Sequence, residues 1–234
     1  MMGRTVSLST IDLTIDSADR QLSARRIGGG DDVPGILFLH GLRSDKTGYQ
    51  PRAEALASRL GVVCLIVDLG GHGASSGVLE DLSPRDHLID AAAAYDELIG
   101  SGEVDPDRVG VCGASYGGYL ASLLVEQRAV RKLFLRAPAL YADRWFDVPL
   151  RDRGPLGETP GASAAQESLA AFDGEVFVLE GGADEAIPPA MVQAYVGAAR
   201  RVRHEVIPEA THRLAEPAWD AAFVGFLVEW FSSL

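Results

Sequence analysis

The sequence is poor in several features that would each mark a particular class of protein. It has only two cysteines, Cys64 and Cys112, and both fall in apolar segments that we predict to be buried strands. We therefore expect no disulfide and no cysteine metal site. Its apolar runs are also short, since the best of them covers only residues 62–67. A membrane helix needs about eighteen such residues, so the sequence argues against a membrane-spanning protein.

Positive charge is scarce as well. The chain has 21 Lys and Arg against 33 Asp and Glu, which gives a net charge of −12 at pH 7. Nucleic acids and anionic membranes need clustered positive charge, and the runs at residues 25–26 and 200–203 are too short to supply it. The first residues lack the basic-then-apolar pattern of a signal peptide. We expect a cytoplasmic protein without a nucleic-acid or membrane partner, and its oligomeric state stays open.

What the sequence has is enough apolar material for one folded unit. Of its 234 residues 47% are hydrophobic, which suits a single domain over residues 1–234. Predicted strands cover residues 6–15, 21–27, 36–39, 62–67, 108–112, 132–136, 176–180 and 204–207, and predicted helices cover residues 52–60, 84–99, 116–127, 189–199 and 219–230. Short apolar strands that alternate with helices predict an α/β fold, with a mostly parallel sheet between two layers of helices.

The most informative stretch is Gly113-Ala114-Ser115-Tyr116-Gly117, which joins a predicted strand to a predicted helix. Glycines on both sides of a serine permit a tight elbow that raises the hydroxyl above the sheet. A second match to the same pattern, at residues 73–77, has no strand directly before it and no long helix directly after it. We interpret that match as a flexible surface loop. Context therefore selects Ser115 as the candidate nucleophile.

A serine needs a base, and the base needs a group that orients it. His212 and Asp184 each follow the end of a predicted strand, which places them at the same edge of the sheet as Ser115. The chain order Ser, Asp, His is the one that accompanies this elbow. Glu185 is the alternative acid. We therefore predict Ser115, His212 and Asp184 as the catalytic residues.

The other four histidines are weaker candidates. His40 follows a predicted strand and is expected to shape a loop beside the site, and His72 is expected to be structural. His87 lies near a predicted helix start and is expected at the surface, whereas His204 opens a strand. For the oxyanion, the backbone N–H of Tyr116 lies at a helix N-terminus, and a second N–H is expected from Leu42.

Taken together, these motifs resemble the α/β-hydrolase superfamily over nearly the whole chain. They are Phe-Leu-His-Gly at 38–41, Asp-Leu-Gly-Gly-His-Gly-Ala-Ser at 68–75, the elbow at 113–118, Gly-Ala-Asp at 182–184 with Ile-Pro at 187–188, and Ala-Thr-His at 210–212. The resemblance implies an eight-stranded sheet whose second strand is antiparallel. It also implies cofactor-free and metal-free serine-hydrolase chemistry on a small acyl substrate. Relatives often carry Arg where this chain has Gly70, so no substrate role is transferred to that loop.

Many relatives have a large lid between the sixth and seventh strands. Here the interval, residues 141–173, has room for only a short cap or one or two helices. His40, Gly41, Tyr141, Trp145 and Phe146 are candidate substrate-binding residues, although the three aromatic side chains fit equally well as packing between this segment and the domain. The short interval favours an esterase over a true lipase.

Three readings of the function follow from the sequence. The first is a carboxylic-ester hydrolase that works through an acyl-enzyme. The second is a thioesterase or an aminopeptidase-like amide hydrolase with the same three residues. The third, from another class, is a non-catalytic ligand-binding protein on the same fold, because a fold alone does not establish an activity.

Overall fold

A sheet of eight strands forms the centre of the computed structural model, which describes residues 8–154 and 161–234. The strands are β1 (Thr10–Ser17), β2 (Arg20–Ile27), β3 (Val33–Leu39), β4 (Val63–Val67), β5 (Val104–Ala114), β6 (Lys132–Arg136), β7 (Glu175–Gly181) and β8 (Val202–Ile207). Their order in the sheet is β1-β2-β4-β3-β5-β6-β7-β8. Strand β2 runs antiparallel to both neighbours, whereas the strands from β4 to β8 in this order pair in parallel. The predicted sheet is thus confirmed, except that residues 6 and 7 of the first predicted strand lie outside the described residues.

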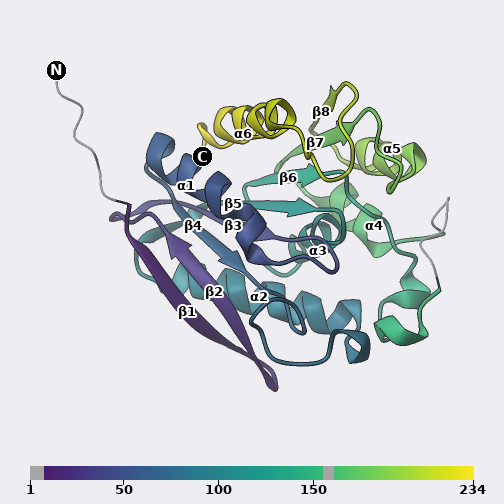
Figure 1. Ribbon diagram of the computed structural model, residues 1–234, viewed down its shortest axis with the longest axis horizontal. Helices are drawn as coiled ribbons and strands as arrows, with labels where there is room; N and C mark the ends of the chain where they lie inside the picture. The colour runs from purple at the N-terminus through teal and green to yellow at the C-terminus, as the bar shows by residue number, and fades with distance from the viewer. Residues whose placement is uncertain (1–7, 155–160) are drawn as a thin grey trace.

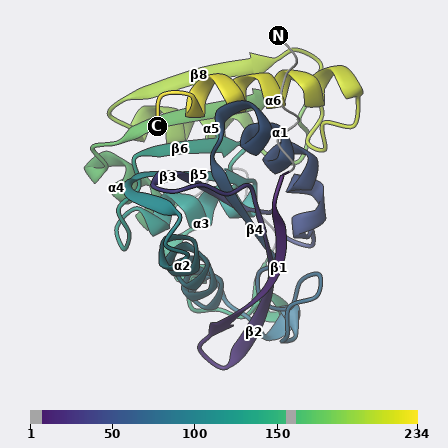
Figure 2. The same ribbon diagram turned by 90° about the vertical axis from the view of Figure 1, so that its left-hand side faces the viewer.

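Helices cover both faces of this sheet (Figures 1 and 2). They are α1 (Gln50–Leu60), α2 (Pro84–Gly100), α3 (Tyr116–Leu124), α4 (Ala164–Ala171), α5 (Pro189–Ala198) and α6 (Pro217–Phe231). Helices α1 and α6 pack on one face, and α2, α3, α4 and α5 pack on the other. On β3, Phe38 faces α1 and α6 while Leu37 and Leu39 face the opposite layer. Because both faces are buried, the strands read as continuous apolar runs, and the predicted three-layer α/β/α architecture is confirmed.

Local signals in the sequence set several element ends. Helix α2 starts with a capping box, in which Ser83 and Asp86 bond each other's backbone N–H, and Pro84 occupies its first turn. Helix α1 ends at Gly61, whose left-handed backbone (φ 68°) suits glycine. Strand β5 begins earlier than predicted, because Val104 pairs with Val33 across the sheet before the register shifts. These differences move element ends without changing the topology.

The segment at residues 141–173 is compact. Its described part contains two short 3-10 helices, Asp143–Trp145 and Leu150–Asp152, followed by α4. Residues 155–160 of this predicted cap lie outside the described residues. Helix α4 packs against α3 and α5, so it belongs to the layer over the sheet. Within the described ranges, no helix has both the length and the apolar composition to span a bilayer.

Candidate active site

Ser115 lies at a sharp turn between β5 and α3. Its backbone has φ 52° and ψ −115°, a conformation that residues other than glycine rarely adopt. Its N–H donates to the Arg136 carbonyl oxygen on the neighbouring strand β6 at 2.9 Å, and its own carbonyl accepts from Gly118 and Tyr119 as α3 begins. Such a backbone costs about 1–3 kcal/mol and persists only where the surrounding structure enforces it.

Two glycines make this elbow possible by leaving space for backbone. A Cβ atom at Gly113 would lie 2.3 Å from the Gly117 carbonyl oxygen, and one at Gly117 would lie 2.1 Å from the Leu39 carbonyl oxygen. Both distances are far inside van der Waals contact. The pattern of glycines around Ser115 is therefore a packing requirement at the junction of β3, β5 and α3.

His212 and Asp184 meet at the carboxyl ends of β8 and β7. His212 Nδ1 lies 2.7 Å from Asp184 Oδ2, and Asp184 Oδ1 accepts the N–H groups of Ala186 (2.8 Å) and Ile187 (3.1 Å). Burial by itself would raise the pKa of Asp184, but the hydrogen bond and charge of His212 and the two N–H groups outweigh it and lower this pKa. An ionised Asp184 accepts the Nδ1 proton, which leaves His212 Nε2 as the acceptor. Glu185, the alternative acid, is exposed to solvent.

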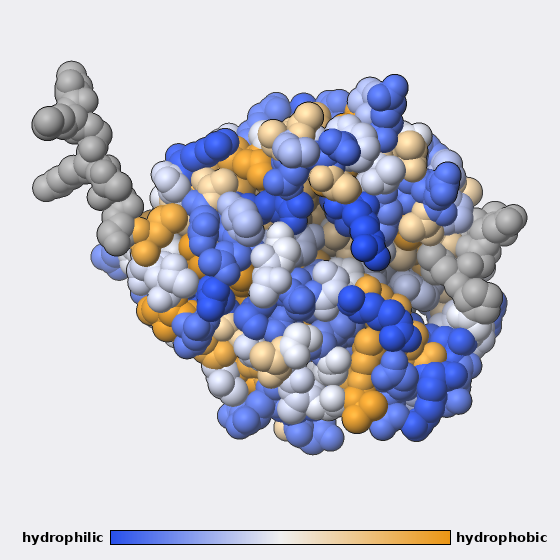
Figure 3. Space-filling view, in the orientation of Figure 1, coloured by the Kyte–Doolittle hydropathy of each residue, from blue (hydrophilic) through white to orange (hydrophobic). Residues whose placement is uncertain are grey.

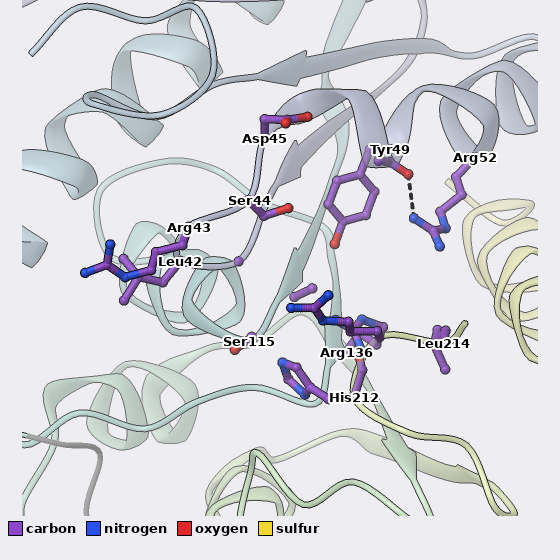
Figure 4. Close-up of a pocket in the computed structure, with 14 residues that line it drawn as sticks. Leu42, Arg43, Ser44, Asp45, Tyr49, Arg52, Ser115, Arg136, His212 and Leu214 are labelled. Carbon is purple, nitrogen blue, oxygen red and sulfur yellow. Dashed lines mark hydrogen bonds between the residues drawn. The ribbon is translucent and has the colours of Figure 1, made fainter. Parts of the chain in front are cut away.

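Ser115 and His212 face one cavity of about 620 Å³ (Figure 4). The rest of it is lined by residues 41–45, 48, 49 and 52, by Ala114 and Arg136, and by residues 213 and 214. Figure 4 labels both residues at the edge of this cavity, and no hydrogen bond joins their side chains in the part of the chain that the structure describes. Gly41, a candidate substrate-binding residue, and Leu42 also line this cavity.

The two backbone N–H groups predicted as oxyanion donors belong to the loop after β3 and to the first residue of α3. Neither Leu42 N nor Tyr116 N donates a backbone hydrogen bond within the described residues. Ser44 N, by contrast, donates to the Gly41 carbonyl oxygen at 3.1 Å and closes the turn that contains Leu42. Tyr116 N lies at the start of α3, where the helix dipole favours negative charge.

His40, a candidate substrate-binding residue, does not line this cavity. It is only 1% exposed, its Nε2 accepts the Leu69 N–H at 3.0 Å, and its Nδ1 lies 2.8 Å from the Gly41 carbonyl oxygen. Burial lowers its pKa to about 4, so the ring is neutral at pH 7. These contacts fit the loop-shaping role expected for His40, which anchors the loop that carries Gly41 and Leu42, and they do not fit its candidacy as a substrate contact in this cavity.

His72 and His87 are both buried. His72 Nε2 accepts the Arg43 N–H at 3.1 Å, which agrees with its predicted structural role. The prediction for His87 is wrong: this residue is fully buried, and its Nδ1 lies 2.8 Å from the Tyr116 hydroxyl. It belongs to the inward face of α2, together with Ala91 and Leu98. The spacing of these residues in the sequence was the signal for that face.

The three aromatic candidates lie elsewhere than in this cavity. Tyr141 packs edge-on against Tyr116 and Tyr119, with ring centroids 5.6 and 5.1 Å apart. Phe146 lies beneath the Arg85 guanidinium, and Trp145 lies beside Arg144. Tyr141 and Phe146 pack against the core beneath α2 to α5. The interpretation that these aromatic residues pack the segment onto the domain therefore describes their contacts better than the interpretation that they line this cavity.

The second Gly-x-Ser-x-Gly match serves the fold. Ser75 Oγ accepts the Ser23 N–H at 2.8 Å and donates to the Asp68 carbonyl oxygen at 2.6 Å. Ser76 N donates to the Gln21 carbonyl oxygen at 2.9 Å. The loop lies at the surface as predicted, but these bonds fasten it to β2, so it is anchored where a flexible loop was expected.

Four arginines that the sequence analysis did not single out line the cavity beside Ser115. They are Arg43, Arg52, Arg136 and Arg213. In the space-filling view, strongly hydrophilic residues border the hollow on this face (Figure 3). One of them could have been found from the sequence, because Arg136 is a charged residue at the carboxyl end of a predicted buried strand. Over the described ranges, no group of three or more His, Cys, Asp or Glu is arranged to hold a metal ion.

Comparison with known proteins identifies the family of this chain. Residues 34–153 match the family described as serine aminopeptidase, S33. An uncharacterized protein of Mycobacterium tuberculosis is 30% identical over 214 residues, which cover 86% of this chain and 72% of that protein. The sn-1-specific diacylglycerol lipase ABHD11 of Mus musculus is 28% identical over 152 residues, which cover 60% of this chain and 39% of that protein.

Solved structures share the fold at lower identity. Est1E from Butyrivibrio proteoclasticus, in a structure with bound ferulic acid, has a TM-score of 0.76 and 20% identity, and the match covers 94% of this chain and 99% of that one. An esterase of Pyrococcus furiosus has a TM-score of 0.76 and 19% identity, over 100% of this chain and 96% of that one. The chain is therefore a hydrolase of the α/β-hydrolase superfamily and belongs to its serine aminopeptidase S33 family.

Proposed function

We propose that this protein is a serine hydrolase that cleaves carboxylic esters through an acyl-enzyme. One observation carries the proposal: the strained elbow presents Ser115 to the same cavity as His212, whose other ring nitrogen bonds Asp184. A strained nucleophile, a base and an orienting acid at one strand edge are the parts that acyl transfer requires.

In the proposed mechanism, His212 Nε2 takes the proton of Ser115 Oγ as this oxygen attacks the ester carbonyl carbon. The N–H groups of Leu42 and Tyr116 stabilise the oxyanion, and each such donor typically contributes a few kcal/mol to the transition state. The intermediate collapses as protonated His212 gives its proton to the departing alcohol. Water then attacks the acyl-enzyme with His212 again as base, and the Ser115 Oγ–acyl bond breaks as protonated His212 returns the proton to Oγ and the carboxylic acid leaves. The Ser115–His212 hydrogen bond commonly tightens only when substrate fills such a site.

Amide hydrolysis is the second candidate, because the matching family is described as a serine aminopeptidase. An aminopeptidase must accept a protonated amine beside the scissile bond. Asp45 is the carboxylate that lines the cavity, and its Oδ1 already accepts the backbone N–H of Thr47 at 2.8 Å. Arg136 and Arg213 in the cavity wall would repel an ammonium group, so the electrostatics favour an ester.

The test is labelling with a fluorophosphonate probe together with hydrolysis of 4-nitrophenyl acetate. We expect a single covalent modification at Ser115, and both labelling and turnover are lost in Ser115→Ala. Ser44→Ala is the matched control, because Ser44 lines the same cavity and should leave labelling intact. Folded wild-type protein that neither labels nor turns over would contradict the proposal and favour a non-catalytic binding protein. Parallel assays with a thioester and an aminoacyl amide rank the alternative substrates.

A further inference from the structure

The cavity beside Ser115 is positively charged although the chain carries a net charge of −12. Two of its four arginines are neutralised by acids outside the cavity. Arg43 pairs with Glu80 at 3.1 Å, and Arg52 pairs with Asp220 at 2.5 Å. The charge available to a ligand therefore comes from the remaining two, Arg136 and Arg213.

Arg136 lies next to the nucleophile. It is the last residue of β6 and pairs in register with Ala114, and its carbonyl oxygen accepts the Ser115 N–H. Figure 4 draws its guanidinium between Tyr49 and the Ser115–His212 pair. One guanidinium nitrogen donates to the His212 carbonyl oxygen. Among the described residues no carboxylate lies within 4.0 Å of this guanidinium, which has five N–H donors in all.

Nearby charges do not cancel this group. Arg213 follows His212, is exposed, and has no carboxylate within 4.0 Å in the described ranges. Asp45 accepts the backbone N–H and the hydroxyl of Thr47, and so caps the 3-10 helix Lys46–Tyr49. Figure 4 draws its carboxylate on the far side of Ser44 from Arg136. The wall formed by Arg136 and Arg213 thus keeps its positive charge.

We propose that Arg136, assisted by Arg213, forms a subsite for a carboxylate that the substrate carries close to its scissile bond. The inference rests on the proposed function and adds the substrate class. A guanidinium matches a carboxylate with two parallel hydrogen bonds, and a partly buried cavity screens that attraction less than open water does. The carboxylate belongs either to the acyl half or to the alcohol half of the ester, and the test separates the two.

The experiment compares kcat/KM within two matched pairs of esters. The acyl pair is 4-nitrophenyl hemisuccinate and its methyl ester, and the alcohol pair is 4-acetoxybenzoate and its methyl ester. Uncatalysed hydrolysis rates correct for intrinsic reactivity. The readout is kcat/KM on the charged ester divided by kcat/KM on its neutral partner. This quotient is measured in wild type, Arg136→Gln and Arg136→Lys. We expect this quotient to fall about 10–100-fold in Arg136→Gln for one of the pairs, and to recover largely in Arg136→Lys.

The control is Arg43→Gln, which removes a cavity arginine that Glu80 already neutralises. It should leave the quotient within about twofold of wild type. An equal fall in Arg43→Gln, or an unchanged quotient in Arg136→Gln for both pairs, would overturn the subsite. Equal loss on charged and neutral esters would assign Arg136 to holding His212 and would also overturn it. A wild type inactive on both the charged and the neutral esters would contradict the proposed function, and the subsite with it.

Discussion

His212 Nδ1 and Asp184 Oδ2 lie 2.7 Å apart, although 28 residues separate them in the chain. The contact forms because β7 and β8 are parallel neighbours, so the loops after them meet at one edge of the sheet. The side chain of Asp184 is 4% exposed and that of His212 is 25% exposed. The acid is therefore enclosed while the imidazole still reaches the cavity.

Asp184→Asn tests the role of this pair. The amide oxygen can still accept from Ala186 and Ile187, so we expect the fold to remain. The amide no longer holds His212 with its proton on Nδ1, and it carries no charge to stabilise a protonated ring. We expect kcat on 4-nitrophenyl acetate to fall by about 10⁴-fold. Glu185→Gln, the exposed neighbour, is the control and should stay near wild type; a similar loss there would point to disruption of the loop.

His212→Ala tests the base itself. The residue is partly exposed, and within the described residues its ring hydrogen-bonds only Asp184, so thermal unfolding should change little. We expect turnover to fall by about 10²–10⁴-fold, the usual contribution of a general base. Folding is checked by circular dichroism. Near-normal turnover would mean that another group takes the Ser115 proton.

Gly117→Ala tests whether the elbow needs its glycine. The added Cβ would meet the Leu39 and His40 carbonyl oxygens at 2.1 and 2.6 Å, and backbone cannot yield as a side chain does. We expect a loss of at least about 1–3 kcal/mol in the free energy of unfolding, with loss of turnover as Ser115 shifts. Urea unfolding and the ester assay measure the two effects.

Gly225→Ala is the matched control for that substitution. Gly225 is exposed within α6, and no heavy atom beyond its own helix backbone and its chain neighbours lies within 4 Å of an added Cβ. Alanine should stabilise the protein by about 0.5–1 kcal/mol and leave turnover unchanged. If both variants behaved alike, the packing argument for the elbow would fail.

The sequence predicted those features of the site that depend on strand ends. Ser115, Asp184 and His212 each follow a recognisable strand, and parallel topology alone brings such positions to one edge. The contact of His212 with Asp184 could therefore be expected before the structure was known. The eight strands could be predicted for the same reason, since short apolar runs between turn residues define a buried parallel sheet.

The remaining features depend on tertiary packing, which local patterns in the sequence indicate only in part. Arg136 faces the cavity because of the pleat and register of β6 beside β5. Tyr141 lies against Tyr116 and Tyr119 because of the path taken by the segment after β6. His87 is buried because of the rotation of α2 about its axis. Each outcome depends on how helices and strands pack against one another, whereas the sequence identifies mainly the helices and strands themselves.

Acidification should destabilise the protein through its buried histidines. Burial lowers the pKa of His40 to about 4 and that of His87 to about 3, and it lowers the pKa of His72 as well. In the unfolded chain the three imidazoles bind protons near pH 6.5, whereas in the folded chain they bind protons only at lower pH. The contribution of these histidines to the free energy of unfolding is thus fully present above about pH 6.5, and it is lost as the pH falls toward 4.

His87→Gln tests this pH dependence. Glutamine can both donate and accept, as the ring does between Gly70 and Tyr116, but it has no proton to gain. We expect the free energy of unfolding to fall less steeply between pH 6.5 and 4.5, by up to about 1.4 kcal/mol per pH unit. Urea titrations at several pH values measure the slope. Identical slopes in both proteins would show that His87 does not resist protonation in the folded state.

The cavity predicts which ester lengths are cleaved well. Its volume is about 620 Å³, and arginines make up four of its fourteen lining residues, so it offers little apolar surface to a long acyl chain. A short acyl group needs no apolar wall. Each further methylene adds the usual ~0.8 kcal/mol of binding free energy only where apolar residues bury it. We expect kcat/KM on dissolved 4-nitrophenyl esters to be highest at two to four carbons. Tributyrin should show no jump in rate when it passes from solution to emulsion. A maximum at twelve or more carbons, or such a jump, would contradict a site for small soluble esters and would point to an apolar acyl channel away from the arginine-lined wall.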